Sequence, residues 1–374
     1  MPVMTAPTYP AARLVADDVQ AHFARHITAA RPPDGAEFEA PPALAIAALI
    51  DVAFWASLRR EEGHTPRISL AFLSPDRASH ALTFAGRLAL SPAVLSKVAP
   101  AVERPGIHLG VWNNGDEFFV WGTTREVPQF CLVVEVVTSG LIVVKHRSEP
   151  FGKFVNVAVL EGDQIKIVDE GVGHVVPDCP AVVTSLAGAK DKRGSGLTTV
   201  LIQLAASMRQ HGRGGALLVV PSGSTEWRDS IVTPMQYAIE PPYSELARLS
   251  CNDSADPDDL RRAVDAIAGL TAVDGATVIN DRYDLLAFGA KIARKRGSTP
   301  VEFVNVTEPV EGSTPVRATP AQLGGTRHLS AAQFVHDQRD ATALVASQDG
   351  RFTIFKWSPH EQFVHAHRVD ALLL

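Results

Sequence analysis

The sequence predicts two domains: an α+β, strand-rich domain over residues 1–185 and an α/β domain over residues 190–374. The chain has 374 residues, more than a single hydrophobic core usually organises. From about residue 66 to residue 176 the apolar residues alternate or form short runs bounded by turn signals, which is typical of paired strands. After residue 196, helix-like and strand-like segments take turns. This alternation predicts a mixed sheet flanked by helices in the C-terminal domain.

Two helices are predicted before the first strand, because apolar residues recur there at intervals of three and four. They cover residues 12–27 and 43–61. Eight strands follow, over residues 67–73, 80–90, 107–114, 117–124, 130–137, 140–147, 154–162 and 163–171. The large aromatic residues of these strands are expected in the core rather than on a surface that stacks on nucleic-acid bases. They are Trp112, Phe118, Phe119 and Trp121.

A glycine- and lysine-rich stretch at residues 185–199 is predicted to link the two domains, since its spacing does not match a phosphate-binding P-loop. Helices are then predicted at residues 198–212, 256–273 and 329–337. Strands are predicted at residues 214–221, 274–279, 301–306, 341–347 and 351–357. The spacing of His360, His365 and His367 fits no common zinc pattern, so a solvated C-terminal segment is expected there.

Composition limits the classes of function. The formal net charge of −6 argues against broad neutralisation of nucleic-acid phosphates. Cys131, Cys179 and Cys251 are far apart and form no Cys-x-x-Cys pair, so free thiols in a reducing compartment are expected. No apolar segment is long enough to span a membrane, and the N-terminus lacks the order of a signal peptide. A cytoplasmic protein without membrane contact is the resulting expectation.

The first candidate for chemistry is the tripeptide Asp274-Gly275-Ala276 at the start of a predicted strand. A carboxylate at a strand end, beside residues with almost no side chain, suits a metal ion and a sugar lying against the backbone. A plain Asp-Gly hairpin turn is the alternative. The same tripeptide occurs at 34–36, but there it lies in a proline-bracketed loop with no strand after it. The context, rather than the tripeptide, therefore points to a site.

The second candidate is the run Gly-Gly-Thr-Arg-His at residues 324–328, which enters a predicted helix. Gly325 and its neighbour can expose backbone N–H groups to an anion, and Thr326 adds a hydroxyl donor. The planar guanidinium of Arg327 suits phosphate oxygens, and His328 can donate to phosphate or transfer a proton. The alternative is a simple helix cap with an exposed arginine. Together these groups predict an anion site at a helix N-terminus.

The third candidate is the strand at 341–347 with the tight turn that follows it, Ser347-Gln348-Asp349-Gly350. Alone it is an ordinary hairpin. Taken in order, however, Asp-Gly-Ala, then Leu-Leu-Ala-Phe-Gly-Ala-Lys-Ile at 285–292, then Gly-Thr-Arg-His, then Ala-x-x-Val-x-Ser resembles the diadenylate cyclase (DAC) domain of bacteria. The resemblance covers about residues 190–374. It implies condensation of two ATP molecules into cyclic di-AMP and pyrophosphate.

The resemblance also implies roles for individual residues. Asp274 would bind Mg²⁺ or Mn²⁺ and help activate the ribose 3′-hydroxyl. Arg327 and His328 would hold the triphosphate as catalytic residues. The remaining nucleotide contacts would come from Gly275, Ala276, Gly289, Gly325, Thr326 and Ser347. Catalysis would require a homo-oligomer in which two ATP-loaded faces meet, and the N-terminal domain would be a sensor for an unknown ligand.

Two positions depart from the pattern of that family. Leu329 stands where many members carry a second basic residue, and Gln348 stands where many carry glutamate. Each change removes a charged group from the predicted site. The departures leave open a second function, in which the same pocket binds adenine nucleotide as a sensor without turnover. A scaffold that has kept only the fold is a third and weaker alternative.

Overall fold

The structure is a computed structural model that describes residues 7–30, 38–61, 63–115, 117–147, 154–169, 178–186, 196–252 and 254–374, without the side chains of 196–199. The chain divides into two compact units, Met1–Val168 with Leu374, and Asp169–Leu373. This division falls before the predicted boundary at 185–190. Most of the predicted linker, residues 187–195, lies outside the described residues, as does the tripeptide at 34–36. No helix of the described residues is long and apolar enough to cross a membrane.

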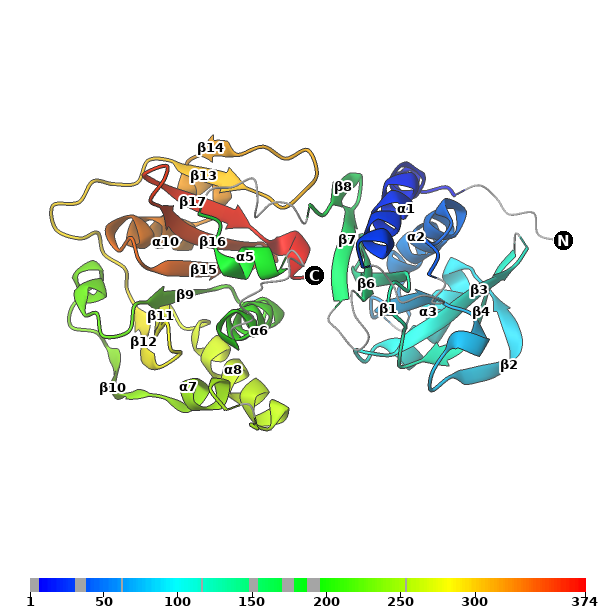
Figure 1. Ribbon diagram of the computed structural model, residues 1–374, viewed down its shortest axis with the longest axis horizontal. Coiled ribbons are helices and arrows are strands. Elements are labelled where there is room, and N and C mark those ends of the chain that lie inside the picture. The colour runs from blue at the N-terminus through cyan, green and yellow to red at the C-terminus, as the bar shows by residue number, and fades with distance from the viewer. Residues whose placement is uncertain are drawn as a thin grey trace. The chain divides into compact units, whose positions relative to one another are not determined.

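The N-terminal unit contains one mixed sheet of eight strands with helices packed against it (Figure 1). Its helices are α1 (Pro10–Ala30), α2 (Ala43–Ser57) and α3 (Pro92–Val98). Its strands are β1 (Ile68–Phe72), β2 (Leu82–Ala89), β3 (His108–Asn114), β4 (Glu117–Thr124), β5 (Val133–Thr138), β6 (Leu141–Arg147), β7 (Phe154–Glu161) and β8 (Gln164–Ile167). The strand order is β2-β4-β3-β1-β5-β6-β7-β8. All eight predicted strands are confirmed.

The main core of this unit lies between the sheet and its three helices. Alternate residues along each strand reach this core, as Ile68 and Leu70 of β1 and Val134 and Val136 of β5 show. The opposite face carries a smaller apolar cluster that includes Ala71 and the thiol residue Cys131. Among neighbouring strands of the sheet, β1 and β3 run parallel and the other pairs are antiparallel.

The C-terminal unit contains a nine-stranded mixed sheet in the order β10-β12-β11-β9-β15-β16-β17-β13-β14. Its strands are β9 (Gly215–Val220), β10 (Tyr237–Tyr243), β11 (Ala276–Asn280), β12 (Leu285–Ala290), β13 (Val304–Thr307), β14 (Val316–Ala318), β15 (Thr342–Ala346), β16 (Phe352–Ser358) and β17 (Phe363–Arg368). Its helices are α5 (Ala181–Leu186), α6 (Gly196–Gln210), α7 (Glu245–Ser250), α8 (Pro257–Leu270), α9 (Pro320–Leu323) and α10 (Thr326–Asp337). The expected mixed sheet flanked by helices is confirmed, although this does not establish a DAC-like domain.

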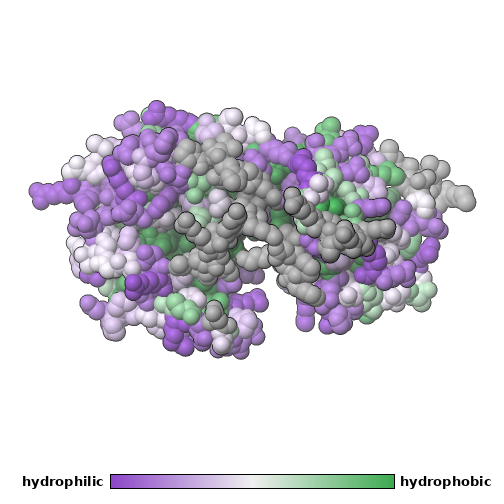
Figure 2. Space-filling view, in the orientation of Figure 1, coloured by the Kyte–Doolittle hydropathy of each residue, from purple (hydrophilic) through white to green (hydrophobic). Residues whose placement is uncertain are grey.

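Two separate cores cover the two faces of this sheet. Leu217 and Val219 of β9 pack with α6 and α8 on one face. Ala216, Leu218 and Val220 of the same strand pack with α10 on the other face. Because β9 is buried along its whole length, it reads as a continuous apolar run rather than an alternating one. Outside these cores, the visible surface of both units is mostly hydrophilic where it is not grey (Figure 2).

The prediction for the C-terminal segment is wrong, and the predicted strands of this unit are incomplete. Residues 363–368 form strand β17, in which His365 and His367 are buried instead of solvated. The register places this strand between β16 and β13, so both histidines lie inside the sheet. Strands β10, β12 and β14 lie outside the predicted strands. The first two carry Pro or Gly residues, which weaken a strand pattern.

A buried histidine in each unit should make stability depend on pH. His108 hydrogen-bonds Ser69 at 2.7 Å, and His367 hydrogen-bonds Thr307 at 2.8 Å. Burial, with nearby Lys145 and Arg147 adding to it, lowers the pKa of His108 from 6.5 to about 4. Burial, with His365 adding to it, lowers the pKa of His367 from 6.5 to about 3. The unfolded chain therefore takes up these protons at a higher pH than the folded chain.

The contribution of these two histidines to the free energy of unfolding is fully present above pH 6.5. It is lost as the pH falls toward about 4 for His108 and toward about 3 for His367. We expect each histidine to lower the free energy of unfolding of its unit by about 1.4 kcal/mol per pH unit in that range. Urea denaturation at a series of pH values measures this slope. His367→Gln should reduce it for the C-terminal unit, whereas substitution of the exposed His360 should not. A free energy that stays constant between pH 7 and pH 5 would contradict the prediction.

Candidate functional site

The topology of the C-terminal sheet brings three of its connections to one end. Strands β9 and β11 are parallel, with Thr277 opposite Leu217, so the segments that enter both strands lie side by side. Strand β15 is antiparallel to β9, with Ala346 opposite Gly215, so the turn that leaves β15 lies at the same end. These connections carry Gly214, Asp274 and Ser347. The Asp-Gly pair at 274–275 joins α8 to β11 and is not a hairpin turn.

Two glycines let backbone segments approach each other at this end. Gly275 has φ +107°, and a Cβ atom added there would lie 2.5 Å from the carbonyl carbon of Gly289. Gly289 has φ +59°, and a Cβ atom added there would lie 2.8 Å from the ring of Tyr237. That ring stacks on Phe288 with centroids 4.7 Å apart and planes 2° from parallel. Only residues without a side chain fit at 275 and 289, so the end of the sheet keeps an exposed backbone surface.

Helix α10 begins at the same end with its first turn uncapped. Its N-cap residue is Gly325, and no side chain in the described part of the chain caps the N–H groups that follow. Thr326 is exposed, and Arg327 is partly buried. A Cβ atom added to Gly214 would lie 3.0 Å from Nη1 of Arg327, so the guanidinium packs against the backbone that enters β9. Backbone N–H groups and a cation therefore converge beside the end of the sheet.

His328, the next residue of α10, is buried, unlike the exposed Thr326. The residue is 1% exposed, and Nε2 is 3.4 Å from the hydroxyl of Thr353. A Cβ atom added to Gly324 would lie 2.3 Å from Nδ1 of His328, so the ring packs against that glycine. Burial is the largest influence on this imidazole and lowers its pKa from 6.5, so it is mainly neutral at pH 7. The histidine thereby holds the glycine turn against α10.

Several polar side chains at this end have no hydrogen-bond or ion-pair partner in the described part of the chain. Among those residues, the side chains of Asp274, Thr326, Arg327 and Ser347 make no hydrogen bond or ion pair. Asp274 is exposed, whereas Arg327 and Ser347 are partly buried. A guanidinium with no acceptor from the described part of the chain is free to bind the oxygens of an anionic ligand. Gln348, by contrast, donates to the carbonyl of Arg213 at 3.4 Å.

The arrangement suits an anionic ligand together with a hard cation. Arg327 and the N-terminus of α10 would contact the anion, and Asp274 provides a carboxylate. Mg²⁺ and Mn²⁺ are commonly held by one or two carboxylates together with phosphate oxygens of a substrate, and one exposed carboxylate meets that need. Of the predicted site residues, the structure thus brings Asp274, Gly275, Gly289, Thr326, Arg327 and Ser347 to one end of the sheet. Ala276 is buried there as the first residue of β11.

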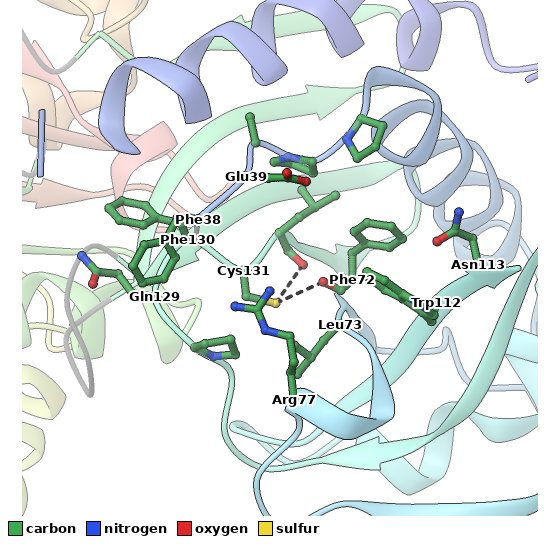
Figure 3. Close-up of a pocket in the computed structure, with 15 residues that line it drawn as sticks. Phe38, Glu39, Phe72, Leu73, Arg77, Trp112, Asn113, Gln129, Phe130 and Cys131 are labelled. Atoms are coloured by element: carbon green, nitrogen blue, oxygen red, sulfur yellow. Dashed lines mark hydrogen bonds between the residues drawn. The ribbon is translucent and has the colours of Figure 1, made fainter. Parts of the chain in front are cut away.

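The N-terminal unit contains a pocket of about 300 Å³ that sequence reasoning missed (Figure 3). It lies at the carboxyl ends of the parallel strands β1 and β3, where α/β sheets often bind ligands. Phe72 stacks on Trp112 at 4.8 Å, and Phe38 meets Phe130 edge-on at 5.5 Å. Arg77 extends toward the thiol of Cys131 in the pocket wall (Figure 3).

That thiol belongs to Cys131 and is not a nucleophile. It donates weakly to the carbonyls of Phe72 and Leu132, each at 3.6 Å. Burial raises its pKa to about 12, against a smaller opposite influence from Arg77. A thiol with this pKa stays protonated at neutral pH. No periodic pattern links the pocket residues, because they come from loops and strand ends far apart in the sequence.

The contact between Gly275 and Gly289 generates a prediction about stability. Gly275→Ala would place a methyl group 2.5 Å from backbone and would force a positive φ on alanine. We expect it to lower the free energy of unfolding of this unit by roughly 1–3 kcal/mol. Gly297→Ala is the matched control, because φ is +84° there but no described atom lies within 4 Å of the added Cβ. Equal losses in the two variants, measured by urea denaturation, would show that the close approach is unimportant.

Comparison with known proteins relates part of the N-terminal unit to a family. Residues 36–125 match the family described as "Probable sensor domain DACNV". No match to a DAC catalytic domain was found, and no curated protein matches the chain. One solved structure, "The crystal structure of the hypothetical membrane spanning protein from Bacillus cereus", is 14% identical, with 50% of this chain and 70% of that chain covered. Its TM-score of 0.26 supports no conclusion about this chain. Residues 36–125 are therefore similar to a probable sensor domain.

Proposed function

We propose that the C-terminal unit is a diadenylate cyclase that condenses two ATP molecules into cyclic di-AMP, and that the N-terminal unit regulates it as a sensor. The observation that carries this proposal is the guanidinium of Arg327, which has no acceptor among the described residues and lies at the uncapped start of α10. A triphosphate would supply that acceptor. The family matched by residues 36–125 adds support, because it is a sensor domain named for its association with diadenylate cyclases.

The proposed roles follow from the position of each residue. The guanidinium of Arg327 and the backbone N–H groups of Thr326 and Arg327 would hold phosphate oxygens, with the hydroxyl of Thr326 beside them. The N–H of His328 already donates to the carbonyl of Gly325 at 3.1 Å. Asp274 would hold Mg²⁺ or Mn²⁺, which would offset the charge of the phosphates. The open backbone at Gly275 and Gly289 would let the nucleoside lie against the sheet. The side chain that follows β15, Ser347, would reach the phosphates from its turn.

The reaction needs little covalent help from the protein. The 3′-oxygen of one ATP forms a bond to the α-phosphorus of the second, the bond from that phosphorus to the β-phosphate oxygen breaks, and pyrophosphate leaves. Asp274 would assist loss of the hydroxyl proton. A second condensation, in which the two nucleotides exchange roles and a second pyrophosphate leaves, closes the ring. Each protomer would hold one ATP, so the two sites must face each other in a homo-oligomer, and placement and charge supply most of the catalysis.

His328 is better suited to positioning than to direct contact with phosphate. Its ring is buried against Gly324 and Thr353, and its lowered pKa leaves it neutral. It would fix the glycine turn that presents Thr326 and Arg327. This role differs from the direct catalytic contact that the family resemblance implied for it.

The second candidate function is binding of adenine nucleotide without turnover. Two observations favour it: Leu329 is 43% exposed at the first turn of α10, and Gln348 is exposed at the turn after β15. Both positions border the proposed site, and neither side chain carries charge. Such a pocket would have less positive charge for pyrophosphate and one carboxylate fewer for a metal ion.

Incubation of the purified protein with ATP and Mn²⁺ or Mg²⁺, followed by chromatography, tests the proposal. We expect cyclic di-AMP from the wild type and a decrease of about 100-fold or more in Arg327→Ala, because a donor to the reacting phosphates is lost. Asp274→Asn should be similarly impaired.

Arg282→Ala serves as the matched control, because Arg282 is exposed at the opposite end of β11. It should retain full activity. ATP binding without product in the wild type would favour the silent sensor instead, and full activity in Asp274→Asn would contradict the role given to that carboxylate.

A further inference from the structure

Three imidazoles meet in the N-terminal unit. His22 and His26 are four residues apart on α1, so they occupy the same face of the helix. His146 comes from β6, which is distant in sequence. One ring nitrogen from each residue lies within 4.8 Å of the other two. The rings of His22 and His26 stack with centroids 4.1 Å apart, and the ring of His146 meets that of His26 edge-on at 5.1 Å.

The cluster is withdrawn from water. His22 is 2% exposed and His146 is fully buried, whereas His26 is intermediate. Phe23 and Phe130 pack against the ring of His146 at 5.1 and 5.5 Å. Neither ring nitrogen of His22 has a hydrogen-bond partner within the residues that the structure describes. A buried polar atom left in this state is unusual and costs free energy, so a partner of another kind is expected.

We propose that His22, His26 and His146 bind a divalent transition-metal ion of the zinc type. Imidazole nitrogen is a preferred ligand of Zn²⁺, and the cluster, as far as the described residues extend, contains no carboxylate that would select Mg²⁺ or Ca²⁺. Tetrahedral coordination at nitrogen–metal distances of about 2.0–2.1 Å places ligand nitrogens about 3.3 Å apart. The rings therefore need only to draw together from their present separations. Three histidines leave a fourth position for water or a small ligand.

The position of the cluster connects the metal ion to the aromatic pocket. The ring of Phe130 contacts that of His146 on one side and that of Phe38 on the other, each pair with centroids 5.5 Å apart. Both phenylalanines line the pocket shown in Figure 3. The N–H of Phe130 also donates to the carbonyl of Arg147, the residue after His146. A metal ion that draws His146 toward α1 would alter the packing of Phe130, and with it the lining of the aromatic pocket.

Titration of metal-free full-length protein with Zn²⁺ tests the proposal, and no ATP is present, so the result is independent of the proposed catalysis. Calorimetry should give one Zn²⁺ per chain, and Co²⁺ should give the ligand-field spectrum of a tetrahedral nitrogen site. His26→Ala should weaken Zn²⁺ binding by about 100-fold or more, since even the loss of groups that only support metal ligands costs about 10–100-fold. Zn²⁺ should raise the unfolding temperature of the wild type and not that of this variant.

The matched control is His64→Ala, because His64 is exposed and belongs to the same unit. It should bind Zn²⁺ as the wild type does. His22→Gln provides a second ligand variant, and since His26 is partly exposed, His26→Ala decides the matter if His22→Gln does not fold. Failure of the wild type to bind Zn²⁺ would overturn the proposal. Binding that is unchanged in His26→Ala would overturn it as well, because the ion would then lie elsewhere.

Discussion

The arrangement of the C-terminal unit depends on strand β9 and its two neighbours. β9 pairs in parallel with β11 and antiparallel with β15, and it is buried on both faces. This combination places the segment before β11 and the turn after β15 beside the segment before β9. Residues more than a hundred positions apart along the chain thereby share one end of the sheet. The helices on either face fix that arrangement, because alternate residues of β9 belong to different cores.

Local backbone chemistry then makes that end open to a ligand. Glycine at 275 and 289 permits two chain segments to touch without side chains between them. Glycine at 214 leaves room for the guanidinium of Arg327, and glycine at 324 leaves room for the ring of His328. Arg327 is thus partly exposed to solvent, whereas the ring of His328 lies in the core. Glycines from two different segments thus accommodate the two adjacent side chains, which explains why Arg327 and His328 have different surroundings.

Many helices and strands could be predicted from the periodicity of apolar residues, but the pairing of strands within each sheet could not. The strands at 67–73 and 214–221 follow from apolar runs, and α8 follows from its Asp-Pro start and strong amphipathic pattern. β17 was missed because buried histidines look polar in a sequence, although hydroxyl partners such as Thr307 make their burial tolerable. His328 appeared equivalent to Arg327 for the same reason. Burial is decided by tertiary contacts that single-residue chemistry does not reveal.

The sites of the N-terminal unit were harder still to predict. His22 and His26 show the four-residue spacing of a helical metal site, but their third partner, His146, becomes visible only when β6 is placed against α1. The aromatic pocket is likewise assembled from two loops, two strand ends and a short 3₁₀ turn at Pro75–Arg77. Sequence reasoning works best for contacts within one element. It fails where function arises between elements.

Hydrogen–deuterium exchange in the presence of ATP and Mn²⁺ reports which end of the C-terminal sheet binds nucleotide. If the nucleotide lies between Asp274 and Arg327, exchange should slow in residues 211–216, 272–277 and 323–329. A second hollow, of about 310 Å³, lies at the opposite end of the same sheet and is lined by Pro180, Tyr283 and Lys356 among others. Slower exchange at residues 180–183 and 281–283, with no change in the first three segments, would show that the nucleotide site has been assigned to the wrong end.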